Sequence, residues 1–140
     1  MTIETQIHIN ASAEKVWNIF TDFEKYPKWN PFVKSLTGEV AEGNQISAVL
    51  AKMTFKPIVL KFQKNKEFRW LGKLFFKGLF DGEHYFILQE NEDNSTTFIH
   101  GEDFSGILVG LFKKKLETET KAGFREMNEA LKKRAEHRNE

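Results

Sequence analysis

Cysteine is absent from this chain of 140 residues. Disulfide bonds, a thiolate nucleophile and cysteine-ligated zinc or iron–sulfur centres are therefore excluded. The sequence also lacks an excess of charge of either sign, because 21 basic and 20 acidic side chains leave a formal net charge of +1. Surfaces that bind nucleic acid normally carry a basic excess, so we expect no nucleic-acid partner.

Long apolar runs are missing as well. The N-terminal segment MTIETQIHIN alternates apolar and polar residues, which is not the pattern of a secretory signal peptide. No segment approaches the ~20 consecutive apolar residues that a transmembrane helix needs. We therefore expect a cytoplasmic protein without stable membrane association, folded as one domain over residues 1–140.

The chain does contain a regular succession of short elements. Alternation predicts a strand over residues 2–10, and Ser12 is a suitable N-cap for a short helix after it. A second short helix at about 23–26 is expected to end near Pro27. Further strands are predicted at about residues 33–40, 45–52, 58–66 and 68–76.

Two longer strands, joined by a turn at 91–95, are predicted within residues 78–106. From about Leu111 to about Ala135 the apolar residues recur at helical spacing. A curved antiparallel sheet leaves one apolar face uncovered, and the terminal helix is the only element long enough to cover it. The sequence therefore predicts an α+β fold in which a curved antiparallel sheet of about seven strands grips a long C-terminal helix, with two short helices after the first strand.

The two strands of residues 78–106 carry the most informative side chains. Because side chains alternate along a strand, one shared face combines apolar residues with two histidines and a carboxylate: His84, Phe86 and Leu88, then Phe98, His100, Glu102 and Phe104. A turn centred near Glu92 sets His84 opposite His100, and a register shifted by two residues sets His84 opposite Glu102 instead. In either register the imidazoles and the carboxylate are neighbours.

Four interpretations of His84, His100 and Glu102 stay open. The side chains can satisfy one another as a buried polar network, in which Glu102 accepts a hydrogen bond from one imidazole. They can instead form the polar end of an apolar ligand pocket. As acid and base at a dry wall they could remove a proton next to a carbonyl, although no nucleophile motif accompanies them. A facial metal triad is the weakest match, because Phe rather than acidic residues flanks these positions.

Other positions add weaker predictions. Alternation places Arg69 and Lys73 on the solvent side of their strand, and Gly72 between large neighbours marks a place where something approaches closely. Gly123 within the terminal helix is explained either by close helix–sheet packing or by extra pocket volume. The apolar segment 106–112 is expected to be a loop that forms a pocket rim with residues 78–80.

The chain resembles the START / polyketide-cyclase-like (SRPBCC) superfamily, whose helix-grip fold has the same order of elements. The resemblance covers nearly the whole chain and is carried by the segments SAEKVWNIFTDFEKYPKWNPF, FRWLGKL, GLFDGEHYF and FIHGEDFSGIL and by the C-terminal helix. Members of this superfamily bind lipids, sterols, polyketides or hormones in an apolar tunnel between sheet and helix, and a minority catalyse cyclisation or dehydration. The fold alone does not establish which of these applies.

The residues and the resemblance together imply a protein that binds a small, mostly apolar ligand, lipid-, polyketide- or aromatic-like, without a metal or other cofactor, as a monomer or homodimer. The alternatives are a cyclase- or dehydratase-type enzyme with His84, His100 or Glu102 as acid/base, and a non-enzymatic protein-interaction module. The expected ligand contacts are Phe62, Trp70, His84, Phe86, Leu88, Phe98, His100, Glu102, Phe104, Gly123, Met127 and Leu131.

Overall fold

The computed structural model describes residues 1–50, 53–73 and 78–137. The elements, in chain order, are β1 (Thr2–Ile9), α1 (Ala13–Phe20), η1 (Phe23–Lys25), α2 (Tyr26–Trp29), β2 (Val33–Thr37), β3 (Ser47–Leu50), β4 (Met53–Phe55), β5 (Ile58–Gln63), β6 (Glu67–Lys73), β7 (Asp81–Glu90), β8 (Thr96–Ser105), α3 (Val109–Lys115), η2 (Leu116–Thr120) and α4 (Lys121–Glu136). The predicted α+β architecture is confirmed, with two short helices after the first strand and a long helix at the C-terminus.

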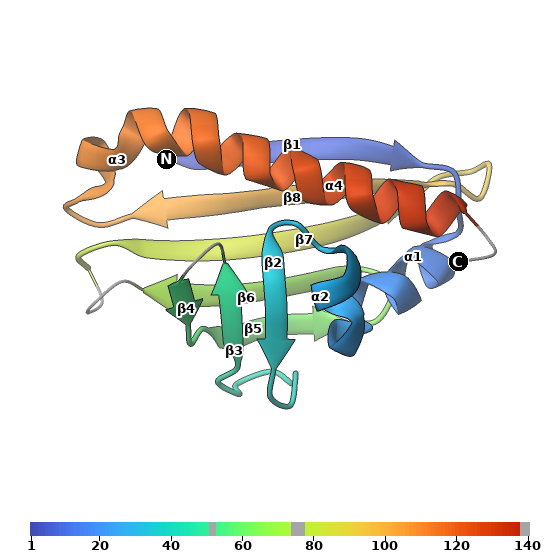
Figure 1. The fold of residues 1–140 in the computed structure, drawn as a ribbon, viewed down its shortest axis with the longest axis horizontal. Coiled ribbons are helices and arrows are strands. Elements are labelled where there is room, and N and C mark those ends of the chain that lie inside the picture. The colour runs from blue at the N-terminus through green and yellow to red at the C-terminus, as the bar shows by residue number, and fades with distance from the viewer. Residues whose placement is uncertain (51–52, 74–77, 138–140) are drawn as a thin grey trace.

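The strands are divided between two sheets. The larger sheet has five antiparallel strands in the order β1-β8-β7-β6-β5, and the smaller has three in the order β2-β3-β4. Figure 1 shows the short strands running across the direction of the long ones. A bridge between Gln45 and Ile58 connects the smaller sheet to β5.

Several strand boundaries differ from the sequence pattern: β2 ends at Thr37 rather than near residue 40, and β5 ends at Gln63 rather than near residue 66. The segment predicted at 45–52 contains β3, and its last two residues lie outside the described residues. The three-residue strand β4 was not predicted, because a strand this short contains no readable alternation. The segment predicted at 68–76 contains β6 as far as Lys73, and its remainder lies outside the described residues.

The first helix forms as its sequence predicts. Ser12 lies at the N-cap with an extended backbone, and its hydroxyl oxygen accepts a hydrogen bond from the Lys15 backbone N–H at 3.2 Å. The prediction that the second helix ends near Pro27 was wrong, because Pro27 lies in the first turn of α2. Proline is tolerated there, since the first N–H groups of a helix have no partner within it.

The C-terminal helix runs without a break from Val109 to Glu136, through a π-helical turn at η2. It lies along β1 and β8 on the inner face of the larger sheet (Figure 1). Its last turns pack with α1 and the sheet in one apolar core, which includes Ile9, Val16, Trp17, Phe20, Phe68, Phe86, Phe98, Met127 and Leu131. The space between sheet and helix is therefore filled near α1.

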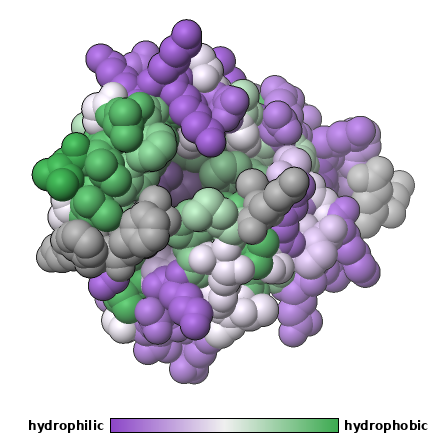
Figure 2. Space-filling model, turned by 60° about the vertical axis from the view of Figure 1, so that its left-hand side comes forward, coloured by the Kyte–Doolittle hydropathy of each residue, from purple (hydrophilic) through white to green (hydrophobic). Residues whose placement is uncertain are grey.

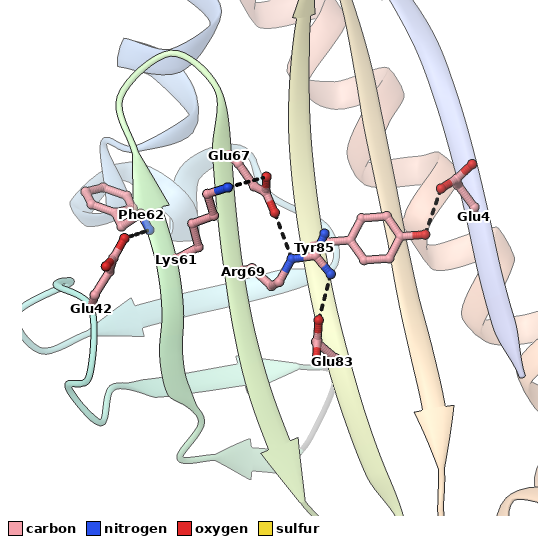
Figure 3. A network of polar contacts seen from close by, with 8 residues as sticks. All are labelled: Glu4, Glu42, Lys61, Phe62, Glu67, Arg69, Glu83 and Tyr85. Carbon is pink, nitrogen blue, oxygen red and sulfur yellow. Dashed lines mark hydrogen bonds and ion pairs between the residues drawn. The ribbon is translucent and has the colours of Figure 1, made fainter.

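The outer face of the larger sheet carries a charged network (Figure 3). Arg69 donates hydrogen bonds of 2.7 Å to Glu67 and to Glu83, and its guanidinium lies 4.7 Å from the ring centroid of Tyr85. Tyr85 in turn donates to Glu4 on β1 at 2.7 Å. Arg69 thus lies on the outer face, as alternation predicts, but it is half-buried and paired.

Tyr85 crosses the neighbouring strand to reach Glu4. A Cβ atom at Gly101 would lie 2.4 Å from the Tyr85 hydroxyl, so the glycine makes room for the ring. Burial and the hydrogen bond to Glu4 raise the pKa of Tyr85 well above its ordinary value. The phenol therefore stays protonated and ties three strands together.

Candidate ligand-binding site

The pairing of β7 with β8 places the predicted polar residues. His84 lies opposite Glu102, and Phe86 lies opposite His100. This is the second of the two registers considered from the sequence. The turn between the strands closes over residues 91–95, with Asn94 in the left-handed region at φ 67°.

The two histidines contact each other directly. The Nε2 atoms of His84 and His100 are 2.7 Å apart, and both side chains are completely buried. The Nδ1 atom of His100 lies 3.0 Å from Oδ1 of Asn128 on α4. The Asn128 amide nitrogen donates to Thr5 on β1 at 2.8 Å, and the Thr5 hydroxyl donates to the His100 carbonyl at 2.9 Å. A hydrogen-bonded chain therefore links β7, β8, α4 and β1.

Burial governs the charge of the inner histidine. Desolvation by burial, together with electrostatic repulsion from neighbouring His84, holds the pKa of His100 well below its ordinary value. His100 is therefore neutral. One of its ring nitrogens carries a proton and the other accepts.

Glu102 lies at the outer end of this chain. Its Oε1 atom is 3.1 Å from Nδ1 of His84, but Nδ1 has no aligned hydrogen-bond partner among the described residues. A Cβ atom at Gly82 would lie 2.1 Å from the other carboxylate oxygen. Gly82 therefore provides the space in which the Glu102 carboxylate rests.

A cavity of about 280 Å³ opens beside Glu102 and His84. Figure 2 shows this end of the molecule, where apolar side chains gather around a hollow. Helix α3 and η2 form one wall, the larger sheet forms the floor, and β3 and β4 close a further side. The lining residues are Phe32, Leu50, Met53, Phe55, Trp70, Gly72, Lys73, Phe80, Gly82, His84, Glu102, Phe104, Phe112, Lys115, Leu116 and Thr120.

The structure brings some of the predicted contact residues to this cavity and leaves others away from it. Trp70, His84, Glu102 and Phe104 line it. His100 lies behind His84. The remainder pack in or against the solid core near α1, and these are Phe62, Phe86, Leu88, Phe98, Met127 and Leu131.

Two glycines named from the sequence differ in their roles. Gly72 lines the cavity, and a Cβ atom there would make only ordinary contacts, at 3.9 Å. Gly123 does not line it. A Cβ atom at Gly123 would lie 2.8 Å from the Phe32 ring, so close packing explains this glycine. Lys73, the last residue of β6, is exposed, as alternation predicts, and also borders the cavity.

The predicted rim is present but is partly helical. Residues Val109–Lys115 form α3, so only the first part of segment 106–112 is a loop. Gly106 has a φ of 117°, and a Cβ atom there would lie 2.6 Å from the Leu79 carbonyl. Phe80 and Phe112 meet across the rim with ring centroids 5.5 Å apart. Ile107 and Leu111 remain 80% and 77% exposed beside the mouth.

Sequence reasoning missed several residues of the site. Asn128 occupies a helix position between the buried Phe124 and Leu131, so a polar residue at an apolar position was an available signal. Thr5 is likewise a polar residue on the inward face of β1. No sequence pattern indicated that Phe32 belongs to the site. It lies in the turn between α2 and β2, and only the tertiary fold brings it to the cavity.

The described residues hold no group of three His, Cys, Asp or Glu side chains placed to bind a metal ion. The Nε2 atoms of His84 and His100 lie 2.7 Å apart and contact each other. Within the same described ranges, no helix is long and apolar enough to cross a membrane.

A curved sheet, a helix laid across it and an aromatic-walled cavity between them define a helix-grip protein. The chain belongs to the family described as "Polyketide cyclase / dehydrase and lipid transport", whose sequence model matches residues 1–136. The resemblance proposed from the sequence is thereby confirmed. Family and fold indicate binding of a ligand in a hydrophobic pocket.

Solved structures support the same fold. A START superfamily protein from Mycobacterium smegmatis is 25% identical, with a TM-score of 0.71, over 96% of this chain and 97% of that one. A hypothetical protein from Helicobacter pylori has a TM-score of 0.81 at 13% identity, over 96% and 88% of the two chains. A Mesorhizobium loti protein has a TM-score of 0.78 at 17% identity, over 100% and 99%. No curated protein matches the sequence.

Proposed function

We propose that this protein binds a small, mostly apolar ligand in the cavity between the larger sheet and the C-terminal helix, with His84 and Glu102 at its polar end. One observation carries the proposal: an aromatic-walled cavity of about 280 Å³ reaches a buried imidazole and a carboxylate. Ligand sites in proteins typically combine an apolar lining with a few convergent polar groups.

The cavity volume restricts the ligand. Pockets for drug-sized molecules measure roughly 300–1,000 Å³, so this one lies at the small end. It holds about nine water volumes at ~30 Å³ each. A compact ligand with one or two fused rings fits inside, whereas a sterol or a long acyl chain would extend beyond the mouth.

Acid–base catalysis is a second candidate, favoured by the contact between His84 and Glu102 at the cavity wall. A carboxylate and an imidazole at a dry wall can take and return a proton. The variant Glu102→Gln separates the two functions. An enzyme would lose turnover of its substrate while retaining affinity, whereas a binding protein would show only a change in affinity.

The test of binding uses a variant that fills the cavity. Gly72 lines the cavity and a Cβ atom there would make only ordinary contacts at 3.9 Å, so Gly72→Ile should project a side chain into the cavity. The matched control is Leu71→Val, on the same strand but outside the cavity lining. Native mass spectrometry with a library of one- and two-ring compounds should find ligands for the unmodified protein and for the control.

Binding should also raise the unfolding free energy, by about 2.7 kcal/mol at a ligand concentration of 100 Kd. Thermal unfolding measures this gain, which Gly72→Ile should abolish. Retention of the same ligands by Gly72→Ile, or absence of any ligand for the unmodified protein, would overturn the proposal.

A further inference from the structure

In each hydrogen bond of the network behind the cavity, the donor and the acceptor can be assigned. The assignment begins at the backbone carbonyl of His100. The carbonyl oxygen of His100 can only accept, so the Thr5 hydroxyl donates its single proton to it. Thr5 must then accept from Asn128, which places the NH₂ group of that amide toward Thr5 at 2.8 Å. The amide oxygen of Asn128 consequently faces His100.

This orientation fixes the protons on both imidazoles. Since Oδ1 of Asn128 only accepts, Nδ1 of His100 carries the proton that it receives. His100 is neutral, so its Nε2 atom is an acceptor. The contact of 2.7 Å between the two Nε2 atoms therefore requires a proton on Nε2 of His84.

The remaining ring nitrogen of His84, Nδ1, is buried on the side of Glu102, and both residues line the cavity. A bare Nδ1 lone pair 3.1 Å from a carboxylate oxygen would be repelled, so one proton belongs to the His84–Glu102 pair. No described acceptor is aligned with Nδ1, and Glu102 keeps 15% of its side chain exposed. The pair thus has unused hydrogen-bonding capacity at the cavity floor.

We propose that this pair presents one donor and one acceptor side by side, and that it selects a ligand carrying a neutral hydroxyl group. Thr5, Asn128 and His100 are positioning residues that set this arrangement. The proposal rests on the proposed function and assigns its ligand class. A hydroxyl oxygen accepts from one member of the pair while its proton is donated to the other.

Other ligand groups fit the pair less well. A ligand carboxylate would bring negative charge against Glu102, and an ammonium would meet the proton that the pair already holds. A pure hydrocarbon would bury the pair without satisfying it. We therefore expect 2-naphthol to bind at least about tenfold more tightly than naphthalene, which matches it in shape.

The first measurement needs no ligand. Two-bond nitrogen–proton correlation spectra of ¹⁵N-histidine-labelled protein should show His100 protonated at Nδ1 and His84 protonated at Nε2. Protonation of His100 at Nε2 instead would overturn the proposal.

A matched pair of variants tests the positioning role. Thr5→Ser retains the hydroxyl and should retain both the His100 tautomer and the preference for 2-naphthol. Thr5→Val keeps the shape but removes the hydroxyl. His100 should then no longer be held in the tautomer protonated at Nδ1, and the preference for 2-naphthol should decrease. An unchanged spectrum in Thr5→Val would contradict the assignment, and a loss in Thr5→Ser would show that packing, not hydrogen bonding, is responsible.

Calorimetric titration with the two naphthyl compounds separates this inference from the proposed function. Equal affinities would overturn the hydroxyl preference and leave the binding function standing. If neither compound binds, the proposed ligand class is overturned. The binding function is then decided by the native mass spectrometry screen of one- and two-ring compounds.

Discussion

The buried imidazole of His100 makes stability depend on pH at the scale of a single residue. Its pKa is lowered in the folded protein, chiefly by burial, so the unfolded chain binds a proton that the folded chain does not. The sign follows from linkage. The contribution of His100 to the free energy of unfolding is fully present above the ordinary histidine pKa of 6.5, and it is lost progressively as the pH falls below that value.

We predict that the free energy of unfolding declines below about pH 6.5, with up to about 1.4 kcal/mol per pH unit from this one group. The variant His100→Gln should lose this part of the slope. Urea unfolding at a series of pH values down to about pH 5 measures the slope, with His8→Gln as the control on the opposite face of β1. An identical slope in His100→Gln would contradict the prediction.

At the scale of elements, the approach of α4 to the loop after α2 shapes the cavity. Phe32 contacts His84, His100 and Phe124 with ring centroids 5.2 to 5.9 Å apart, so its ring is held on several sides. Gly123 allows the helix to come against this ring. The helix position is therefore coupled to the cavity wall through one glycine.

We predict that Gly123→Ala destabilises the protein by about 1–3 kcal/mol, although alanine has the better helix propensity by ~1 kcal/mol. The added Cβ would lie 2.8 Å from a ring that cannot easily move. Gly110→Ala is the matched control, because a Cβ there meets no described atom within 4 Å, and it should raise stability. Chemical unfolding measures the free energy of unfolding of both variants. A stabilised Gly123→Ala would contradict the packing argument.

At the scale of the whole molecule, the interior between sheet and helix is divided. The end near α1 is packed solid with aromatic and aliphatic side chains, whereas the end near α3 holds the cavity. Empty apolar volume forfeits van der Waals contacts and so lowers stability. A glycine in the interior of strand β6 adds to this cost, since it reduces strand preference.

We predict that Gly72→Ile, which blocks the cavity, also raises the free energy of unfolding by about 1 kcal/mol. For a domain of this size the melting temperature should increase by roughly 4 °C. Differential scanning calorimetry without ligand measures the change. A lower melting temperature would show that the cavity is too constricted for the added side chain.

The prediction of the fold from the sequence succeeded where the signals were local. Strand alternation placed Arg69 on the outer face and His84 on the inner face, and helical spacing identified the terminal helix. The boundaries were less well predicted near Pro27, whose position in a first helical turn depends on the preceding 3₁₀ turn at Phe23–Lys25.

The sequence by itself determined the order of elements apart from β4, and it determined the shared face of His84, His100 and Glu102, because alternation is a property of neighbouring residues. Only the tertiary structure decided that His84 pairs with Glu102 across β7 and β8, and that Asn128 and Thr5 complete the chain behind them. These contacts join residues up to 123 positions apart. Such contacts and the volume left unfilled depend on how distant side chains pack together, which no local pattern records.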